Sequence, residues 1–177
     1  MTAVTVRPMV PDHPPEALAI EQAGQPQPWT EGLFLAELAE PTRAYRVALD
    51  PSGTVLGFGG ILVAVDEMHV TTLATSADHL RRGIASHLMV ELMDEALARG
   101  ATAATLEVRT ENHAAQRLYA RFGFAPVGVR PGYYAATGED ALIMWAHDID
   151  GADAARRLDG LRVASAPART ATLEGAR

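Results

Sequence analysis

The strongest pattern in the sequence is an amphipathic helix in the stretch RRGIASHLMVELMDEALARG, residues 81–100. Apolar residues recur along it three and four positions apart, as on the buried face of a helix. They are Ile84, Ala85, Leu88, Met89, Leu92, Met93, Ala96 and Leu97. Strand-like stretches flank this helix at residues 68–75 and 103–108. A helix of this kind between two strands has to cover a sheet, so the sequence predicts a mixed α/β domain.

The remaining patterns extend this α/β plan over residues 1–149. Further strands are expected at residues 4–7, 45–49, 55–65, 124–129 and 141–147, and further helices near 14–24, 30–41 and 113–122. The turn sequence DPSG at 50–53 joins two of these strands into a hairpin. The prediction is therefore a sheet of about seven strands flanked by four helices.

The composition changes after residue 149. Residues 150–177 are rich in Ala and Arg and hold few large apolar side chains. We expect a flexible C-terminal tail there, with at most one helical turn near Leu158.

Charge and composition exclude several functions. The formal net charge of −7 argues against a nonspecific nucleic-acid binder. The absence of cysteine excludes disulfides, thiol catalysis and zinc–thiolate sites. The start of the sequence lacks a signal-peptide pattern, and no apolar run is long enough to span a bilayer. We expect a cytoplasmic monomer with no membrane or nucleic-acid partner.

The start of the long helix is suited to binding phosphate. Backbone N–H groups in the first turn of a helix are unpaired and carry partial positive charge. Gly83 allows close approach of the backbone, and Arg81 and Arg82 add positive charge. Neither a P-loop ending nor a dinucleotide glycine fingerprint is present. An ordinary loop containing a glycine remains the alternative.

The stretch TLEVRTENHAAQRLYARFGF, residues 105–124, places an acid and a phenol among apolar neighbours. Alternation along the strand puts Glu107 on a face that a folded domain would cover, where it needs a partner such as Arg109 or a hydrated cleft. Helical spacing puts Tyr119 on the inward side of the following helix, where it could equally be a core tyrosine. Asn112 stands at an N-cap position, and capping alone would explain it.

Several short stretches in the same order resemble a known family. They are PWTEGLF (28–34), LEVRTEN (106–112), RLYARFGF (117–124), RPGYY (130–134) and EDALIMW (139–145). With them, residues 4–147 resemble the GNAT acyl-CoA-dependent N-acetyltransferases, and most of all the bacterial ribosomal-protein-alanine N-acetyltransferases. The resemblance implies the GNAT fold, with a mixed and mostly antiparallel sheet, and acetyl-CoA as cofactor.

The resemblance also implies roles for individual residues. Glu107 would be the general base and Tyr119 the general acid. The coenzyme would be held by Leu73, Ala74, Thr75, Arg81, Arg82, Gly83, Ile84, Ala85, Ser86 and Asn112. Trp29, Tyr133, Tyr134 and Glu139 would line the peptide channel, although a core tryptophan and ordinary loop aromatics are nearly equal alternatives. The family's usual proline and its arginine or glutamine are replaced by Ala77 and Leu80, so any side-chain bond made at Leu80 is in doubt.

The expected reaction is direct transfer of acetyl from acetyl-CoA to the α-amine of a protein that begins with alanine, a basic ribosomal protein. The six histidines show no ligand-like spacing, and the reaction requires no metal. Two alternatives remain at this stage. One is the same fold acting on lysine side chains or on a small-molecule amine. The other is a non-catalytic domain that binds coenzyme A and serves a partner protein.

Overall fold

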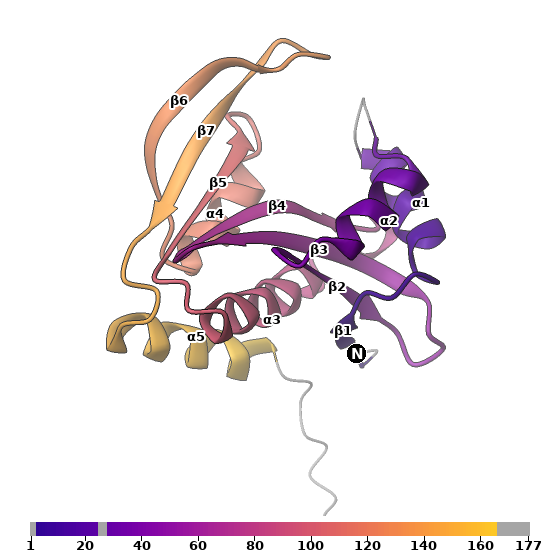
Figure 1. Cartoon of the computed structure of the whole chain (residues 1–177), viewed down its shortest axis with the longest axis horizontal. Helices are drawn as coiled ribbons and strands as arrows, with labels where there is room; N and C mark the ends of the chain where they lie inside the picture. Colours follow the sequence, from indigo (N-terminus) through magenta and orange to yellow (C-terminus); the bar gives the residue numbers. More distant parts are fainter. Residues whose placement is uncertain (1–2, 25–27, 166–177) are drawn as a thin grey trace, which may run out of the picture.

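The computed structural model describes residues 3–24 and 28–165 (Figure 1). These residues form seven strands, five α-helices and one short 3-10 turn. In chain order the elements are β1 (Thr5–Pro8), α1 (Pro14–Gly24), α2 (Glu31–Ala39), β2 (Arg43–Leu49), β3 (Val55–Ala64), β4 (Glu67–Thr75), the 3-10 turn (Ala77–His79), α3 (Ile84–Ala98), β5 (Ala103–Arg109), α4 (His113–Arg121), β6 (Ala125–Tyr134), β7 (Glu139–Ala146) and α5 (Ala152–Ser165). The predicted order of strands and helices is confirmed up to β7.

All strands belong to one mixed sheet in the order β1-β2-β3-β4-β5-β7-β6. Neighbouring strands are antiparallel except β4 and β5, which pair in parallel through three residues only, from Glu67 with Ala103 to His69 with Thr105. Beyond His69 the two strands separate, as the diverging ribbons of Figure 1 show. A register shift against β3 leaves Thr71 as an extra residue in β4, a bulge that bends the strand. The sheet is therefore split at its centre.

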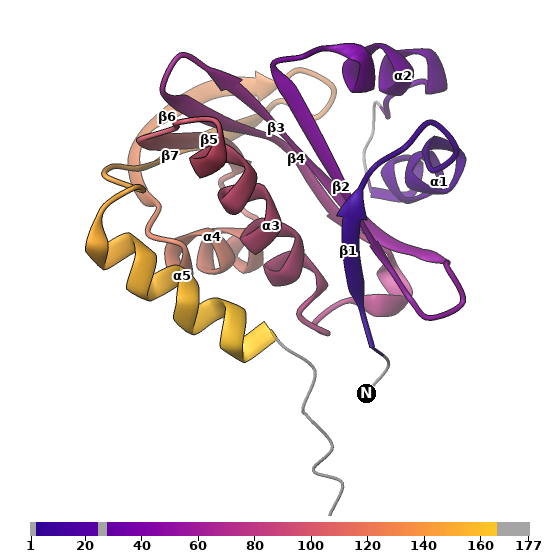
Figure 2. The ribbon, with the colours of Figure 1, turned by 60° about the horizontal axis from the view of Figure 1, so that its bottom comes forward.

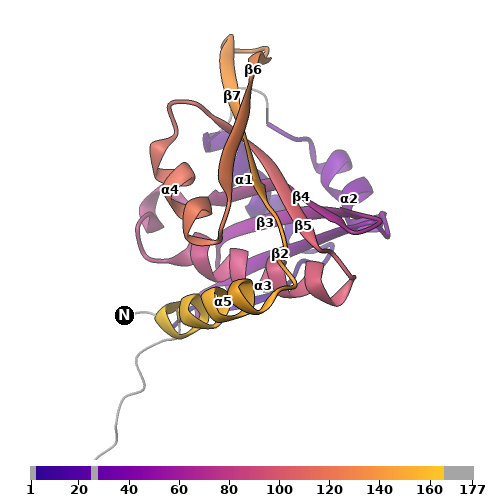
Figure 3. The same cartoon turned by 90° about the vertical axis from the view of Figure 1, so that its left-hand side faces the viewer.

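Helices cover both faces of the sheet (Figure 2). The larger core packs α3, α4 and α5 against one face and includes Met89, Leu92 and Leu106. A second core on the opposite face packs α1 and α2 around Phe34 and Phe58. Figure 3 shows α4 beside the separated half of the sheet and α3 lying along the other half. The alternation predicted for residues 103–108 is confirmed, because Ala104, Leu106 and Val108 all lie in the larger core.

The C-terminal region corrects the prediction of a flexible tail. Residues 152–165 form α5, a fifth helix, which packs on α3. Its contacts are two leucines, Leu158 and Leu161, in the larger core and an ion pair of 2.7 Å between Arg162 and Asp94. Two apolar residues sufficed to dock the helix, and composition alone did not reveal them. Residues 166–177 of the predicted tail lie outside the described residues.

The sixth strand is longer than the sequence predicts. β6 continues through Pro131 and Gly132 to Tyr134, whereas the strand pattern ended at residue 129. A register shift between Arg130 and Tyr134 lets the hairpin with β7 pass the proline. The hairpin thereby carries Tyr133 and Tyr134 over the split in the sheet. None of the described helices is long and apolar enough to cross a membrane.

Candidate active site

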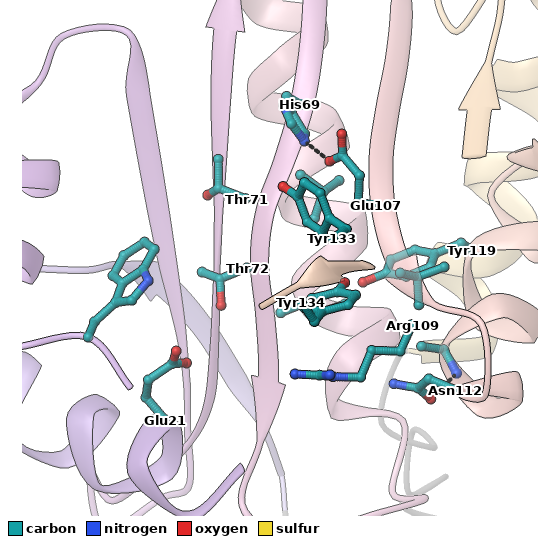
Figure 4. Close-up of a pocket in the computed structure, with 15 residues that line it drawn as sticks. Glu21, His69, Thr71, Thr72, Glu107, Arg109, Asn112, Tyr119, Tyr133 and Tyr134 are labelled. Atoms are coloured by element: carbon teal, nitrogen blue, oxygen red, sulfur yellow. Dashed lines mark hydrogen bonds and ion pairs between the residues drawn. The ribbon is translucent and has the colours of Figure 1, made fainter. Parts of the chain in front are cut away.

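A cleft of about 410 Å³ opens where β4 and β5 separate (Figure 4). Its walls come from β4, β5, α4, the end of α1, the residues before α2 and the β6–β7 hairpin. The side chains that line it include His69, Thr71, Thr72, Leu73, Glu107, Arg109, Asn112, Tyr119, Tyr133, Tyr134, Glu21 and Trp29. The sequence-predicted acid and phenol therefore meet in one cleft.

Glu107 reaches the cleft from the face of β5 opposite to Leu106. Its side chain is 10% exposed and has two basic partners on other strands. Oε2 lies 2.6 Å from Nε2 of His69, and Oε1 lies 3.5 Å from a guanidinium nitrogen of Arg130. The carboxylate thus has partners, as its burial requires.

Arg109 is not the partner of Glu107, in contrast to the alternative that the sequence left open. It pairs instead with Glu139 of β7 at 2.9 Å. Its guanidinium also stacks over the ring of Tyr134, 4.0 Å from the ring centre. Arg109 therefore holds the turn end of the β6–β7 hairpin, where Tyr134 pairs with Glu139.

Tyr119 belongs to both the core and the cleft. Its ring packs edge-on against Phe124, with 5.9 Å between the ring centres, and only 8% of the residue is exposed. Burial raises the pKa of Tyr119 far above its ordinary value, and the neighbouring Tyr134 adds to the effect. The phenol therefore holds its proton throughout the neutral range, so it can donate a hydrogen bond or a proton but cannot serve as a base.

The wall opposite β5 is aromatic and acidic. Trp29 packs edge-on against Phe34 of α2 at 5.1 Å and also lines the cleft. It therefore contributes to the core, and its role in a peptide channel stays a prediction. Tyr133 and Tyr134 come from the hairpin. Glu139 does not line the cleft; it supports Arg109, which does.

Glu21 of α1 lines the same wall. It is 5% exposed, and its Oε2 has no hydrogen-bond partner among the described residues. Burial raises the pKa of Glu21. An unpaired acid here favours a cationic or amide-bearing ligand.

The predicted phosphate site lies at the start of α3. A second cavity of about 510 Å³ is lined there by Arg81, Arg82, Ile84 and His79. Gly83 precedes the helix in the left-handed region, with φ of 79°, and its side-chain side is open space. Ala85 and Ser86 lie in the first turn, where N–H groups are unpaired by helix geometry. Leu80 is 57% exposed. We expect phosphate to be held by the backbone N–H groups of this first turn, which we call the cradle, and not by the side chain at position 80.

Leu73, Ala74 and Thr75 connect the two cavities along the end of β4. They pair with β3 on one side only, since β5 has already separated from β4. Every second N–H and C=O of such an edge faces the gap, ready to pair with an extended amide-bearing ligand. A split sheet edge followed by a helix start with unpaired N–H groups is suited to a ligand that joins amides to a phosphate group, as coenzyme A does.

Asn112 caps α4, as the sequence allowed. Its side-chain oxygen accepts a hydrogen bond of 3.1 Å from the N–H of Ala115. The residue also lines the cleft. Capping accounts for the oxygen and leaves its amide N–H₂ available to a ligand.

Sequence reasoning missed two cleft residues, His69 and Glu21. His69 stood among scattered histidines, and only the pairing of β4 with β5 places it beside Glu107. Glu21 lies in a helix predicted at residues 14–24, but which face of that helix is buried depends on a sheet far along the chain. The one signal in the sequence was that Glu21 is a charged residue within an apolar helical pattern. Among the described residues, no group of His, Asp or Glu is arranged to hold a metal ion.

The family model described as the Acetyltransferase (GNAT) family matches residues 14–124, more than half of the chain. The chain therefore belongs to the GNAT family of acetyltransferases, whose acetyl donor is acetyl-CoA. The split sheet and the cradle at α3 agree with this assignment.

Curated relatives include enzymes named as acetyltransferases of a ribosomal protein alanine and of α-amines. The ribosomal protein bS18-alanine N-acetyltransferase of Escherichia coli is 36% identical over 73% of this chain and 88% of its own. The N-alpha-acetyltransferase RimI of Mycobacterium tuberculosis is 40% identical over 66% of this chain and 74% of its own. The crystal structure of the Escherichia coli enzyme superposes with a TM-score of 0.74 at 30% identity, covering 82% of this chain and 94% of that one.

Proposed function

We propose that this chain acetylates the N-terminal α-amine of a ribosomal protein that begins with alanine, by direct transfer from acetyl-CoA in a ternary complex in the cytoplasm. The observation that carries the proposal is the meeting of Glu107 and Tyr119 in one cleft at the split between β4 and β5. The relative that is 36% identical is named for acetylation of alanine in ribosomal protein bS18, and the one that is 40% identical is named an N-alpha-acetyltransferase.

An α-amine suits the chemistry of this cleft. Only a neutral amine attacks a thioester. With a pKa of about 8, roughly one α-amine in ten is neutral at pH 7, against about one in 2,500 for a lysine near 10.4. This difference is worth about 3 kcal/mol. A carboxylate such as Glu107 is a sufficient base for the first amine and a poor one for the second.

The bond changes assign one role to each side chain. The amine nitrogen bonds to the thioester carbonyl carbon and the carbon–sulfur bond breaks. Glu107 takes the proton that the nitrogen loses, directly or through a water. Tyr119 donates its proton, or a hydrogen bond, to the leaving sulfur. A backbone N–H near Leu73 stabilises the negative charge that develops on the carbonyl oxygen.

The donor is held by groups that the chain places in order. Backbone groups of Leu73, Ala74 and Thr75 pair with the pantetheine amides. The first turn of α3, from Arg81 to Ser86, binds the pyrophosphate, with Arg81 and Arg82 adding charge. Asn112 contacts the same ligand from α4. The thioester supplies the activated acetyl group.

The acceptor enters from the aromatic wall. Trp29, Tyr133 and Tyr134 flank the peptide, and Glu139 holds Arg109 in place beside them. Glu21 gives this wall an unpaired acid, and the chain carries a net charge of −7. Both features suit a basic N-terminal segment.

A pair of matched peptides tests the proposal. One begins with a free alanine and contains no lysine; the other has the same sequence with a blocked N-terminus and one internal lysine. We expect kcat/KM to be at least tenfold higher for the free alanine, in line with the difference in neutral amine. Faster acetylation of the lysine peptide would favour a lysine acetyltransferase. Binding of acetyl-CoA without transfer to either peptide, or to small-molecule amines, would favour a non-catalytic domain.

A further inference from the structure

The reaction steps above leave the imidazole of His69 without a role. Its Nε2 lies 2.6 Å from Oε2 of Glu107, and Figure 4 shows the two side chains pointing toward one another. The carboxylate is 10% exposed and the imidazole 34% exposed. The histidine therefore links a buried base to solvent.

The split in the sheet explains why His69 can reach Glu107. His69 is the last residue of β4 that pairs with β5, opposite Thr105. Glu107 follows two positions later on the same face of β5, just as the strands separate. A β4 side chain nearer the phosphate loop would face a widening gap instead of a carboxylate.

The charges around the pair are few. Arg130 of β6 approaches Oε1 of Glu107 at 3.5 Å, and its side chain is 55% exposed. Glu67 precedes His69 by two positions on the same face of β4 and is exposed. Arg109 of β5 lines the same cleft and pairs with Glu139. The cleft also contains three phenols, those of Tyr119, Tyr133 and Tyr134.

We propose that His69 is a positioning residue for Glu107: its neutral imidazole donates a hydrogen bond from Nε2 to Oε2 and leaves Oε1 to take the proton of the acceptor amine. The inference rests on the proposed function, because it requires Glu107 to be the base. The bond also restricts rotation of the carboxyl group, so that Oε1 faces the cleft in each turnover.

Two substitutions separate positioning from packing. His69→Ala removes the donor, and we expect kcat to fall about tenfold, as for the loss of one hydrogen bond to a charged group. His69→Gln keeps an N–H donor at a similar reach. We expect it to recover most of kcat, which a packing role alone would not predict. The KM for acetyl-CoA should stay within about twofold in both.

The matched controls are His147→Gln, an exposed histidine outside the cleft, and Glu107→Gln. The first should leave kcat unchanged, and the second should lower kcat more than either His69 variant. If His69→Ala keeps kcat, or His69→Gln loses as much kcat as His69→Ala, the positioning role is wrong, while a strong Glu107→Gln effect preserves the proposed function. If His69→Gln is as inactive as Glu107→Gln, the imidazole is itself the base. If Glu107→Gln keeps kcat, the proposed function fails first.

Discussion

Glu107 on β5 and Tyr119 on α4 line the same cleft from different environments. The carboxylate has His69 and Arg130 as partners, whereas the phenol packs against Phe124 in the larger core. Apolar burial favours the neutral form of the phenol. The fold thus supplies a proton acceptor and a proton donor at one place.

Replacing the acceptor should stop the chemistry and leave cofactor binding intact. For Glu107→Gln we expect kcat to fall by roughly 100-fold or more, the usual contribution of a general base. The Kd for coenzyme A, measured by calorimetry, should be unchanged because Glu107 lies away from the cradle at α3. Equal kcat in the variant and the native chain would remove Glu107 from the reaction.

Replacing the donor gives a different signature. For Tyr119→Phe we expect kcat to fall by roughly ten- to 100-fold, with the same fold stability. Because burial raises the pKa of Tyr119, the native phenol stays protonated well above neutrality, so no decline of kcat up to about pH 9 should come from it. A decline below pH 9 that disappears in Tyr119→Phe would contradict this assignment.

The cradle should depend on the left-handed residue before α3. Gly83 has φ of 79°, and alanine in that region costs about 1 kcal/mol or more. We expect Gly83→Ala to raise the Kd for coenzyme A several-fold, as calorimetry would show, with the peptide KM little changed. Gly32→Ala in α2 is the matched control, since open space surrounds that glycine. Equal Kd values in the two variants would place the phosphates elsewhere.

The docked helix α5 should contribute to stability. Leu161→Ala removes a buried side chain from the larger core and should lower the free energy of unfolding by about 2–3 kcal/mol, measured by urea titration. Val163→Ala on the same helix alters an exposed residue and should change it by less than about 0.5 kcal/mol. Similar small effects from both would show that α5 does not remain on α3.

Buried Glu21 should make stability depend on pH. Its pKa is raised in the folded chain, so the folded state binds more protons than the unfolded state between the two values. This contribution destabilises the fold at pH 7 and is relieved as the pH falls through the folded pKa. At pH 7 we expect the free energy of unfolding of Glu21→Gln to exceed that of the native chain by on the order of 1 kcal/mol. Near pH 4.5 we expect this gain to be smaller. The exposed Glu31→Gln is the control, and a pH-independent gain would contradict the burial effect.

Local patterns predicted most of the fold. Thr30 and Asn112 were expected at helix starts, and both accept the capping hydrogen bond, at 3.2 and 3.1 Å. Alternation placed Glu107 opposite to the core face of its strand. The helix at residues 152–165 was missed because Leu158 and Leu161 are too few to form a clear stripe, and α3 supplies the rest of the apolar surface.

The site was harder to predict from the sequence, because it depends on contacts between segments that are far apart in the chain. The pairing of His69 with Glu107 needs the parallel register of β4 and β5. The pairing of Arg109 with Glu139 needs the antiparallel register of β5 and β7. A single sequence does not encode either register locally. The split that forms the cleft is itself a missing pairing, which no pattern within one strand reveals.

The most direct measurement is mass spectrometry of ribosomal protein N-termini from cells that contain the native chain or its Glu107→Gln variant. The account predicts that one ribosomal protein beginning with alanine is acetylated on its α-amine in the first cells and free in the second. Identical N-termini in the two cells, or a difference confined to lysine side chains, would contradict it.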